Sequence, residues 1–571
     1  MTQTYDPITT TLAGRLPFIL FLAAVLTLLV SIGLLKRYRR AVFRSMRTRA
    51  NLGPTEPLSL ETSALLQRPV QTALDLPIRD AVSVMPAGSA AEGLYADLLR
   101  APWRAAAIYA VAGFCYAFVM ATAFLVATHS EFLPLRFLVL LWDYAWPVVL
   151  TVNLVAAATW RIRLVNVSVY LLTLVALGSI ALARNPALSW GQFARLWFII
   201  NFPATVLLLA FLNRRVRAVG PLVLTFMTVA LLGSYLIILA VAGNDARLLR
   251  SVAEIGVALG LDGFGIFIGL VVLGLAAFGV VGWLTLRWIG GRYKRKEISD
   301  RSIIIDAIWL LFGVLQSTIL VVDNVLWILT GLLAFVVYKV VAWAGFSLLG
   351  YKAPSMRKSP ALLLLRVFSL GKRSERLFDA LAMHWRYAGS IRLIAGPDLV
   401  TTTVEPHEFL DYLSGKLARR FIDRPQTFDL RIAEMDMQPD RDGQFRVNDF
   451  FCYDDTWRMV LSRLVSECDA VLMDLRGFSS QNDSCVFEID ELINVVSLGR
   501  VVFIIDDTTD ELFLRQTMQQ SWDHMRPTSP NRLSTSGPMQ LFRFTGSRHA
   551  ELQQLLRSLC VAAKAASLTA A

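Results

Sequence analysis

The sequence is poor in the residues from which metal sites and disulfide frameworks are built. Its 571 residues include five cysteines and five histidines. The cysteines after residue 450 show neither a CxxC spacing nor a Cys/His pattern of the kind that binds zinc; they are Cys452, Cys468, Cys485 and Cys560. We therefore expect free thiols, no metal site and no disulfide.

The sequence also lacks an internal repeat with a period of about 20–50 residues, and it has neither a low-complexity run nor a Walker-type phosphate-binding sequence. These absences argue against a repeat protein and against a P-loop nucleotide site. Gly371 and Lys372 alone are too short a match to indicate such a loop.

Acidic residues are scarce in the first part of the chain. Residues 1–360 hold 32 Lys and Arg against 16 Asp and Glu, whereas residues 361–571 hold 24 against 28. The whole chain is 55% hydrophobic, and its mean hydropathy is +0.53, which is typical of a membrane protein. The basic excess belongs to the hydrophobic part, where it marks loops that face the cytoplasm, so it does not indicate a nucleic-acid partner.

A transmembrane helix needs about 20 mostly apolar residues. Nine stretches meet this requirement, and they lie at residues 17–35, 105–127, 135–158, 164–183, 196–212, 219–242, 264–286, 303–321 and 325–347. The basic cluster at residues 36–40 follows the first stretch in place of a cleavage site, so this stretch is expected to remain attached as a span. The predicted partner of this region is the lipid bilayer.

The positions of Lys and Arg predict the orientation, because basic loops resist translocation across the membrane. Basic residues gather at 36–49, 161–163, 214–217 and 292–296, which all face the same side if the N-terminus is external. We expect a multi-pass protein of the cell inner membrane whose last third is cytoplasmic. The predicted organisation is a first transmembrane helix at 1–40, a cytoplasmic loop at 41–104, an eight-span region at 105–350, a linker at 351–360 and a cytoplasmic domain at 361–571.

Three ionisable residues fall within the predicted spans. Asp306 and Lys339 are equidistant from the turn between the last two spans, so they are expected to meet across the hairpin. A structural ion pair is the favoured interpretation, and part of an ion or proton path is the alternative. Asp143 has no evident partner, and we expect it to be hydrated near the interface rather than to line a wet cavity. Broken helices in corresponding halves are not evident, which favours an anchor or sensor over a pump.

The pattern changes at residue 361, where short apolar runs begin to alternate with amphipathic stretches. Five runs read as strands, at 362–368, 391–395, 470–475, 501–505 and 539–544, with helices near 374–387, 406–420, 454–467, 485–497, 509–523 and 548–563. Strands that are apolar throughout predict a parallel sheet covered on both faces, so we expect a doubly wound, flavodoxin-like α/β domain. An irregular insertion is expected at about 421–453. Ligands bind such sheets at the carboxyl ends of the strands.

A polar loop follows the strand that ends at Leu475, and residues 476–492 read RGFSSQNDSCVFEIDEL. Gly477 suits a turn, and Asp483 or Ser484 can cap the helix that follows. Glu488 is expected in the first turn of this helix, half-buried and directed toward the strand ends. The functional interpretation is a site carboxylate. The alternative is an acidic residue that only favours the helix dipole.

Residues 470–492, with the helix start Ser484-Cys485-Val486-Phe487-Glu488, resemble the segment of TIR domains in which a strand and a serine-containing loop precede a Trp-Cys-x-x-Glu helix start. Residues 362–379, LLLLRVFSLGKRSERLFD, look like the first strand, loop and helix of that family. The resemblance covers residues 361–563. It implies a TIR-like fold, association with further copies of the chain, and cleavage of the nicotinamide glycosidic bond of NAD with Glu488 as the catalytic group. NAD would be the substrate, and no cofactor would be required.

The resemblance leaves substrate binding open, because Ser484 replaces the usual tryptophan and the stretch at 421–451 is longer than a simple TIR connection. Residues of the two loops that could contact the nucleotide are Ser369, Lys372, Arg373, Ser374, Arg376, Asp474, Arg476 and Ser479. The leading hypothesis is a membrane-anchored signalling or defence effector that binds and hydrolyses a nicotinamide nucleotide. The alternatives are a non-catalytic self-associating module and, third, a transporter with a regulatory domain.

Overall fold

The computed structural model describes most of the chain. The described residues are 25, 28–45, 78–80, 89–157, 159–185, 189–211, 219–243, 246–320, 325–349, 359–367, 372–395, 409, 412–413, 415, 417–435, 437–453, 456–532, 538–545 and 549–569. The chain divides into two compact units. The helical unit comprises residues 1–37, 105–350 and 404–410, and the α/β unit comprises residues 38–104, 351–403 and 411–571.

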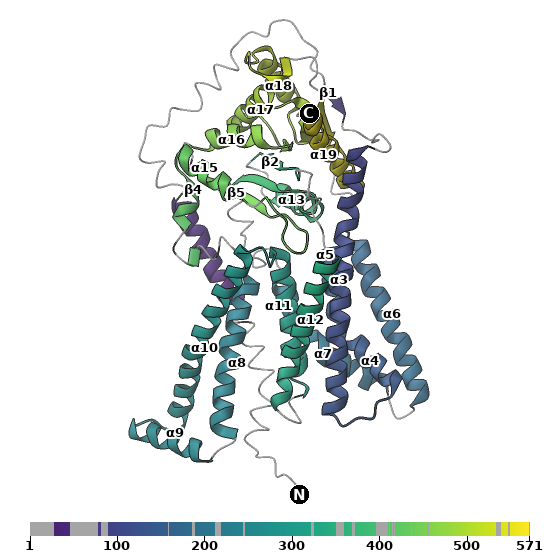
Figure 1. Ribbon diagram of the computed structural model, residues 1–571, viewed down its shortest axis with the longest axis vertical. Helices are drawn as coiled ribbons and strands as arrows, with labels where there is room; N and C mark the ends of the chain where they lie inside the picture. The colour runs from purple at the N-terminus through teal and green to yellow at the C-terminus, as the bar shows by residue number, and fades with distance from the viewer. Residues whose placement is uncertain are drawn as a thin grey trace. The chain divides into compact units, whose positions relative to one another are not determined.

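The helical unit is built from long apolar helices (Figure 1). Helix α3 (Ala90–Ala127) contributes its residues from 105 onward to this unit. The other helices are α4 (Pro134–Tyr144), α5 (Trp146–Val155), α6 (Trp160–Arg184), α7 (Trp190–Phe211), α8 (Gly220–Gly243), α9 (Ala246–Ala258), α10 (Gly263–Lys294), α11 (Asp300–Ser317), the short 3-10 helix η2 (Val325–Ile328) and α12 (Leu329–Leu348).

Among the residues that the structure describes, six helical segments are long and apolar enough to cross a membrane. They are Ala90–Ala127, Pro134–Val155, Trp160–Arg184, Trp190–Leu209, Gly263–Lys294 and Leu326–Leu348. Each of them contains one of the predicted spans in whole or in large part. Three predicted spans remain. The span at residues 219–242 coincides with α8. The span at 303–321 coincides with α11, which is 18 residues long and includes three charged residues. The first predicted span, at 17–35, lies largely outside the described residues.

The predicted contact between Asp306 and Lys339 is confirmed. Lys339 Nζ on α12 donates to Asp306 Oδ2 on α11 at 2.6 Å. Gly313 and Gly331 allow this close approach, because a Cβ at either position would collide with the backbone of the other. The two helices therefore pack with their backbones in near contact, which brings the carboxylate within reach of the ammonium group.

The α/β unit contains one eight-stranded sheet in which every pair of neighbouring strands is parallel. The order across the sheet is β1-β8-β7-β6-β2-β3-β5-β4. The strands are β1 (Ile78–Asp80), β2 (Leu362–Arg366), β3 (Ile391–Ala395), β4 (Phe421–Ile422), β5 (Val447–Cys452), β6 (Ala470–Asp474), β7 (Val501–Ile505) and β8 (Met539–Arg543). The parallel-sheet α/β region is thus confirmed. From β2 the chain builds the sheet outward through β3 and then returns to β6 on the other side of β2, so the switch point lies between β2 and β6.

The prediction of five strands was wrong, because three more strands join the sheet. Strands β4 and β5 lie within residues 421–453, which were expected to form an irregular insertion, and β1 comes from residues expected to form a loop. β1 and β4 are only three and two residues long, and β5 begins with Val-Asn-Asp, which breaks the continuous apolar run expected of a central strand.

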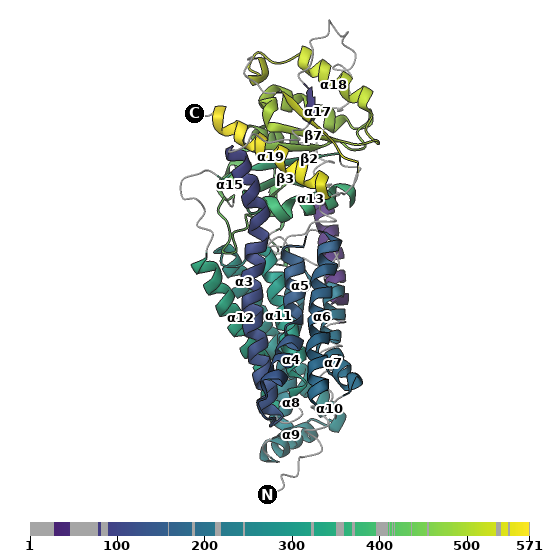
Figure 2. The same ribbon diagram turned by 90° about the vertical axis from the view of Figure 1, so that its right-hand side faces the viewer.

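Helices cover both faces of the sheet, and alternate residues of each strand point to opposite faces. On one face Leu363 and Leu365 pack with helices α15 (Pro425–Ala433), α16 (Trp457–Glu467), α17 (Asp483–Val495) and α18 (Glu511–Asp523). On the other face Leu362 and Leu364 pack with α13 (Lys372–Trp385), α19 (His549–Thr569) and the first part of α3. Figure 2 shows α13 and α19 together on this second face. These layers hold the strand ends rigidly in place.

Candidate functional site

The candidate site lies at the carboxyl ends of β2, β6 and β7, beside the switch point of the sheet. Arg366 ends β2 and Asp474 ends β6, and the two residues are paired in the register of these strands. Asp506 directly follows β7. Because parallel strands present their carboxyl ends on the same edge, the topology brings three charged residues from distant parts of the sequence to one edge of the sheet.

Asp474 is held in a fully buried network. Arg476 donates to both of its carboxylate oxygens, from Nε to Oδ1 and from Nη2 to Oδ2, each at 2.7 Å. Ser374 Oγ, on α13, donates to Oδ2 at 2.8 Å. Gly477 has φ of +70°, a conformation that favours glycine and turns the chain directly after the arginine. The bidentate pair of Arg476 and Asp474 is a strong form of ion pairing. The hydrogen bond from Ser374 joins this loop to the first turn of α13.

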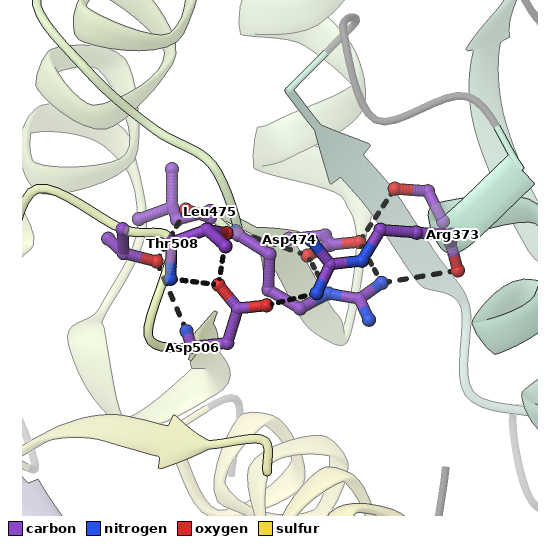
Figure 3. Close-up of polar contacts among 8 residues, drawn as sticks. Arg373, Asp474, Leu475, Asp506 and Thr508 are labelled. Carbon is purple, nitrogen blue, oxygen red and sulfur yellow. Dashed lines mark hydrogen bonds and ion pairs between the residues drawn. The ribbon is translucent and has the colours of Figure 1, made fainter. Parts of the chain in front are cut away.

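A second ion pair lies next to this network (Figure 3). Arg373 Nη2 contacts Asp506 Oδ2 at 2.6 Å, and Arg476 Nη2 donates to the Arg373 backbone carbonyl at 3.4 Å. Asp506 Oδ1 also accepts from the backbone N–H of Thr508 at 3.0 Å. The Arg373 side chain remains 52% exposed, so its guanidinium is the part of the network that a ligand in solvent can reach.

Glu488 is more deeply buried than the sequence suggested. It is 3% exposed rather than half-buried, and it lies in the second turn of α17, because this helix begins at Asp483. Its neighbours Ile489 and Leu492 are fully buried against the sheet. The packing of α17 on the sheet therefore also buries Glu488. Glu488 Oε2 has no hydrogen-bond partner among the described residues.

The electrostatic environment of Glu488 favours its neutral form. Burial raises the pKa of the carboxyl group from 4.5 to about 8, and the positive charge of Arg366 opposes this shift only in part. The nearby Cys485 thiol donates to the Arg366 carbonyl at 3.9 Å, and burial together with Glu488 raises the pKa of this thiol well above its ordinary value. Glu488 is therefore mostly protonated at pH 7, and Cys485 stays a neutral thiol.

The other expected site residues are placed differently. Ser479 donates to Asn482 Oδ1 from its backbone N–H and its hydroxyl, so it shapes the turn before α17. Arg376 is exposed, and the described residues offer it neither a hydrogen bond nor an ion pair. Lys372 begins α13, but its side chain lies outside the described part of the structure, as does all of Ser369.

Two residues of the site were missed in the sequence. Asp506 follows the predicted strand at 501–505 directly, so its position at a strand end could have identified it. Arg366 was not predicted, because it belongs to the apolar run of β2; in the structure it is 5% exposed. Within the described residues no group of three His, Cys, Asp or Glu side chains lies close enough together to hold a metal ion.

Arg373, on α13, is an exposed cation held by the buried carboxylate of Asp506. The buried Asp474 fixes the neighbouring loop, and Glu488, on α17 at the opposite face of the sheet, is a buried neutral acid. Such a set can bind an anionic ligand at Arg373 and exchange a proton at Glu488. Comparison of the chain with family models, with curated proteins and with solved structures gave no significant match.

Proposed function

We propose that the chain is a nine-span protein of the cell inner membrane with an external N-terminus, and that its α/β unit is a cytoplasmic, TIR-like domain. In this proposal the domain binds a nicotinamide nucleotide and hydrolyses its glycosidic bond, as part of a signalling or defence response. The observation that carries the proposal is the network of Arg373, Ser374, Asp474, Arg476 and Asp506 at the switch point of the sheet.

The network offers a place for the phosphates of the nucleotide. Arg373 lies in the first turn of α13, where the helix dipole and free backbone N–H groups favour negative charge. Asp506 Oδ2 contacts Nη2 of the Arg373 guanidinium at 2.6 Å. The exposed part of the guanidinium can bind phosphate oxygens. Asp474 engages Nε and Nη2 of Arg476, and this arginine is only 4% exposed, so its part in the proposal is to position the loop.

Glu488 supplies the chemistry in this proposal. Heterolysis of the bond between C1′ of the ribose and the pyridinium nitrogen releases neutral nicotinamide and leaves an oxocarbenium-like ribose, which water then attacks with loss of a proton. A buried carboxyl group with a pKa of about 8 loses its proton readily when positive charge develops beside it, and the resulting carboxylate stabilises that charge. Burial makes this interaction stronger than it would be in water.

A pair of arginine variants tests the binding step. Arg373 and Arg376 are both exposed and lie on the same turn of α13, but only Arg373 belongs to the network. We expect Arg373→Ala to weaken NAD binding by the full-length protein about tenfold, or ~1.4 kcal/mol, and Arg376→Ala to leave it unchanged. Isothermal titration calorimetry in nanodiscs measures both.

Equal affinities for the two variants would contradict the proposed site. A wild-type protein that forms oligomers but does not bind NAD would instead favour the non-catalytic self-associating module. These results separate the two functions, because the scaffold needs no anion site at the switch point.

A further inference from the structure

Asp143 lies at a break within the helical unit. Helix α4 ends at Tyr144, Ala145 connects the two helices, and α5 begins at Trp146 with Pro147 in its first turn. Asp143 is the tenth of the 22 residues between Pro134 and Val155, so it is near the middle of a candidate membrane span. Proline cannot donate a helical hydrogen bond, which explains why the helix is interrupted here.

The carboxyl group of Asp143 is enclosed, and no described residue is a partner for it. The residue is 0% exposed, and neither Oδ1 nor Oδ2 accepts a hydrogen bond within the described residues. The expectation that Asp143 is hydrated near the interface was therefore wrong. The sequence could not reveal this burial, because the surrounding residues come from other helices.

Uncharged polar side chains from three other helices converge on the break. Asn201 Nδ2, on α7, donates to the Asp143 backbone carbonyl at 3.0 Å. Gln316 Nε2, on α11, donates to Asn201 Oδ1 at 3.1 Å, and Tyr116 of α3 donates to Gln316 Oε1 at 2.8 Å. All three of these residues are fully buried. The break is thus lined by hydrogen-bonding groups that hold its backbone and leave the carboxyl group untouched.

The titratable groups that face Asp143 are tyrosines. Tyr144, on its own helix, and Tyr170, on α6, lie within electrostatic range of it, and Tyr116 lies within range of Tyr144. The residues that approach from α7 and α11, Asn201 and Gln316, carry no charge. Asp143 forms no ion pair within the described residues, in contrast to Asp306, which Lys339 neutralises at 2.6 Å.

An isolated carboxylate in such surroundings is very unfavourable, since none of the described residues supplies a cation that would offset its lost hydration. Protonation removes the charge and keeps the fold intact. A carboxyl group that must carry a proton when enclosed, and that lies at a helix break lined by polar groups near mid-span, has the properties of a proton carrier.

We propose that Asp143 is a proton-binding site through which the helical unit moves protons across the membrane. The carboxylate takes up a proton when it is exposed to one side, carries it as the neutral acid when enclosed, and releases it to the other side. A helix break and polar groups that converge near mid-span occur in transport proteins, and the sequence pattern did not reveal either of them here.

Proton flux in proteoliposomes tests this inference. The full-length protein is reconstituted into vesicles that contain a pH-sensitive dye, and an imposed pH gradient is followed with valinomycin and potassium present to prevent a membrane potential. We expect wild-type vesicles to lose the gradient at least ten times faster than protein-free vesicles, and Asp143→Asn to abolish this difference. Asparagine is nearly isosteric and neutral, so it replaces the protonated acid with little effect on folding.

Two further variants complete the experiment. Asp262→Asn changes an exposed carboxylate at the start of α10 and should keep the wild-type rate. Asp143→Glu keeps a carboxyl group and should retain measurable flux, which guards against a misfolded Asp143→Asn protein. A wild-type rate equal to that of protein-free vesicles, an unchanged rate in Asp143→Asn, or a flux that requires sodium would overturn the inference.

Discussion

At the scale of single residues, two of the buried carboxyl groups of the α/β unit, those of Asp474 and Glu488, lie in different environments. Asp474 receives two hydrogen bonds from the Arg476 side chain, one from the Arg476 backbone N–H and one from Ser374. Glu488 Oε2 receives none within the described residues, and only the charge of Arg366 opposes the effect of its burial on the pKa. The first group is part of the framework, whereas the second can gain or lose a proton near neutral pH.

The burial of Glu488 predicts a dependence of stability on pH. Its pKa is about 8 in the folded state against 4.5 ordinarily, so between these values the folded protein holds a proton that the unfolded chain releases. The stabilising contribution is complete below pH 4.5 and is lost as the pH rises through about 8, by up to about 1.4 kcal/mol per pH unit. Glu488→Gln should remove this slope from the free energy of unfolding, measured by denaturant titration across the range.

The exposed Glu434, on the same face of the sheet, provides the control. Glu434→Gln should keep the wild-type slope, because this side chain is 69% exposed and pairs with Arg431 at the surface. Identical slopes for wild type and Glu488→Gln would show that the carboxyl group at 488 titrates normally in the folded protein.

The site could be predicted from the sequence where position along a strand was enough. Asp474 and Arg476 follow a continuous apolar run, and parallel strands place such residues at one edge of the sheet. The pairing of Asp474 with Ser374 and the burial of Glu488 could not be predicted, because both depend on how α13 and α17 pack over the sheet. No local pattern records these long-range contacts.

At the scale of elements, residues 421–453 are an integral part of the α/β unit. Strand β5 pairs with β3 along its length, and β4 pairs with β5 at the edge of the sheet. Phe428 of α15 and Phe450 of β5 are buried in the main core with their ring centroids 5.9 Å apart. The five strands that were predicted are mostly apolar along their length, while the three that were missed are very short or partly polar.

Loss of a core aromatic in this segment should therefore destabilise the whole unit. Phe450→Ala is expected to cost about 3–5 kcal/mol, because it removes buried surface and leaves a cavity. The thermal midpoint of the unit in scanning calorimetry should fall by ~10 °C. Leu430→Ala, in α15 of the same segment, removes a side chain from a residue that is 66% exposed and should change stability by less than ~0.5 kcal/mol. Similar shifts for the two variants would mean that the segment is not part of the core.

At the scale of the whole molecule, the chain before residue 361 and the chain from residue 361 onward differ in charge. Basic residues outnumber acidic ones two to one in residues 1–360, and the ratio is reversed to a slight acidic excess in residues 361–571. This asymmetry supports the proposed orientation, in which the α/β unit remains in the cytoplasm. The orientation also determines which nucleotides the site can meet.

Cysteine labelling tests the orientation in intact cells. Leu512 is 70% exposed on α18, whereas Cys452, Cys468, Cys485 and Cys560 are buried. A Leu512→Cys protein should resist a membrane-impermeant maleimide in intact cells and react after permeabilisation, with the wild-type protein as the background. Reaction before permeabilisation would place the α/β unit outside and remove cytoplasmic NAD as its substrate.

Release of nicotinamide from NAD by the full-length protein, reconstituted at high density to allow association, tests the central claim most directly. We expect wild-type protein to release nicotinamide, Glu488→Gln to be slower by about 10²-fold or more, and Glu434→Gln to match wild type. Equal rates for wild type and Glu488→Gln, or bound NAD that is never cleaved, would contradict the assignment of Glu488 as the catalytic group.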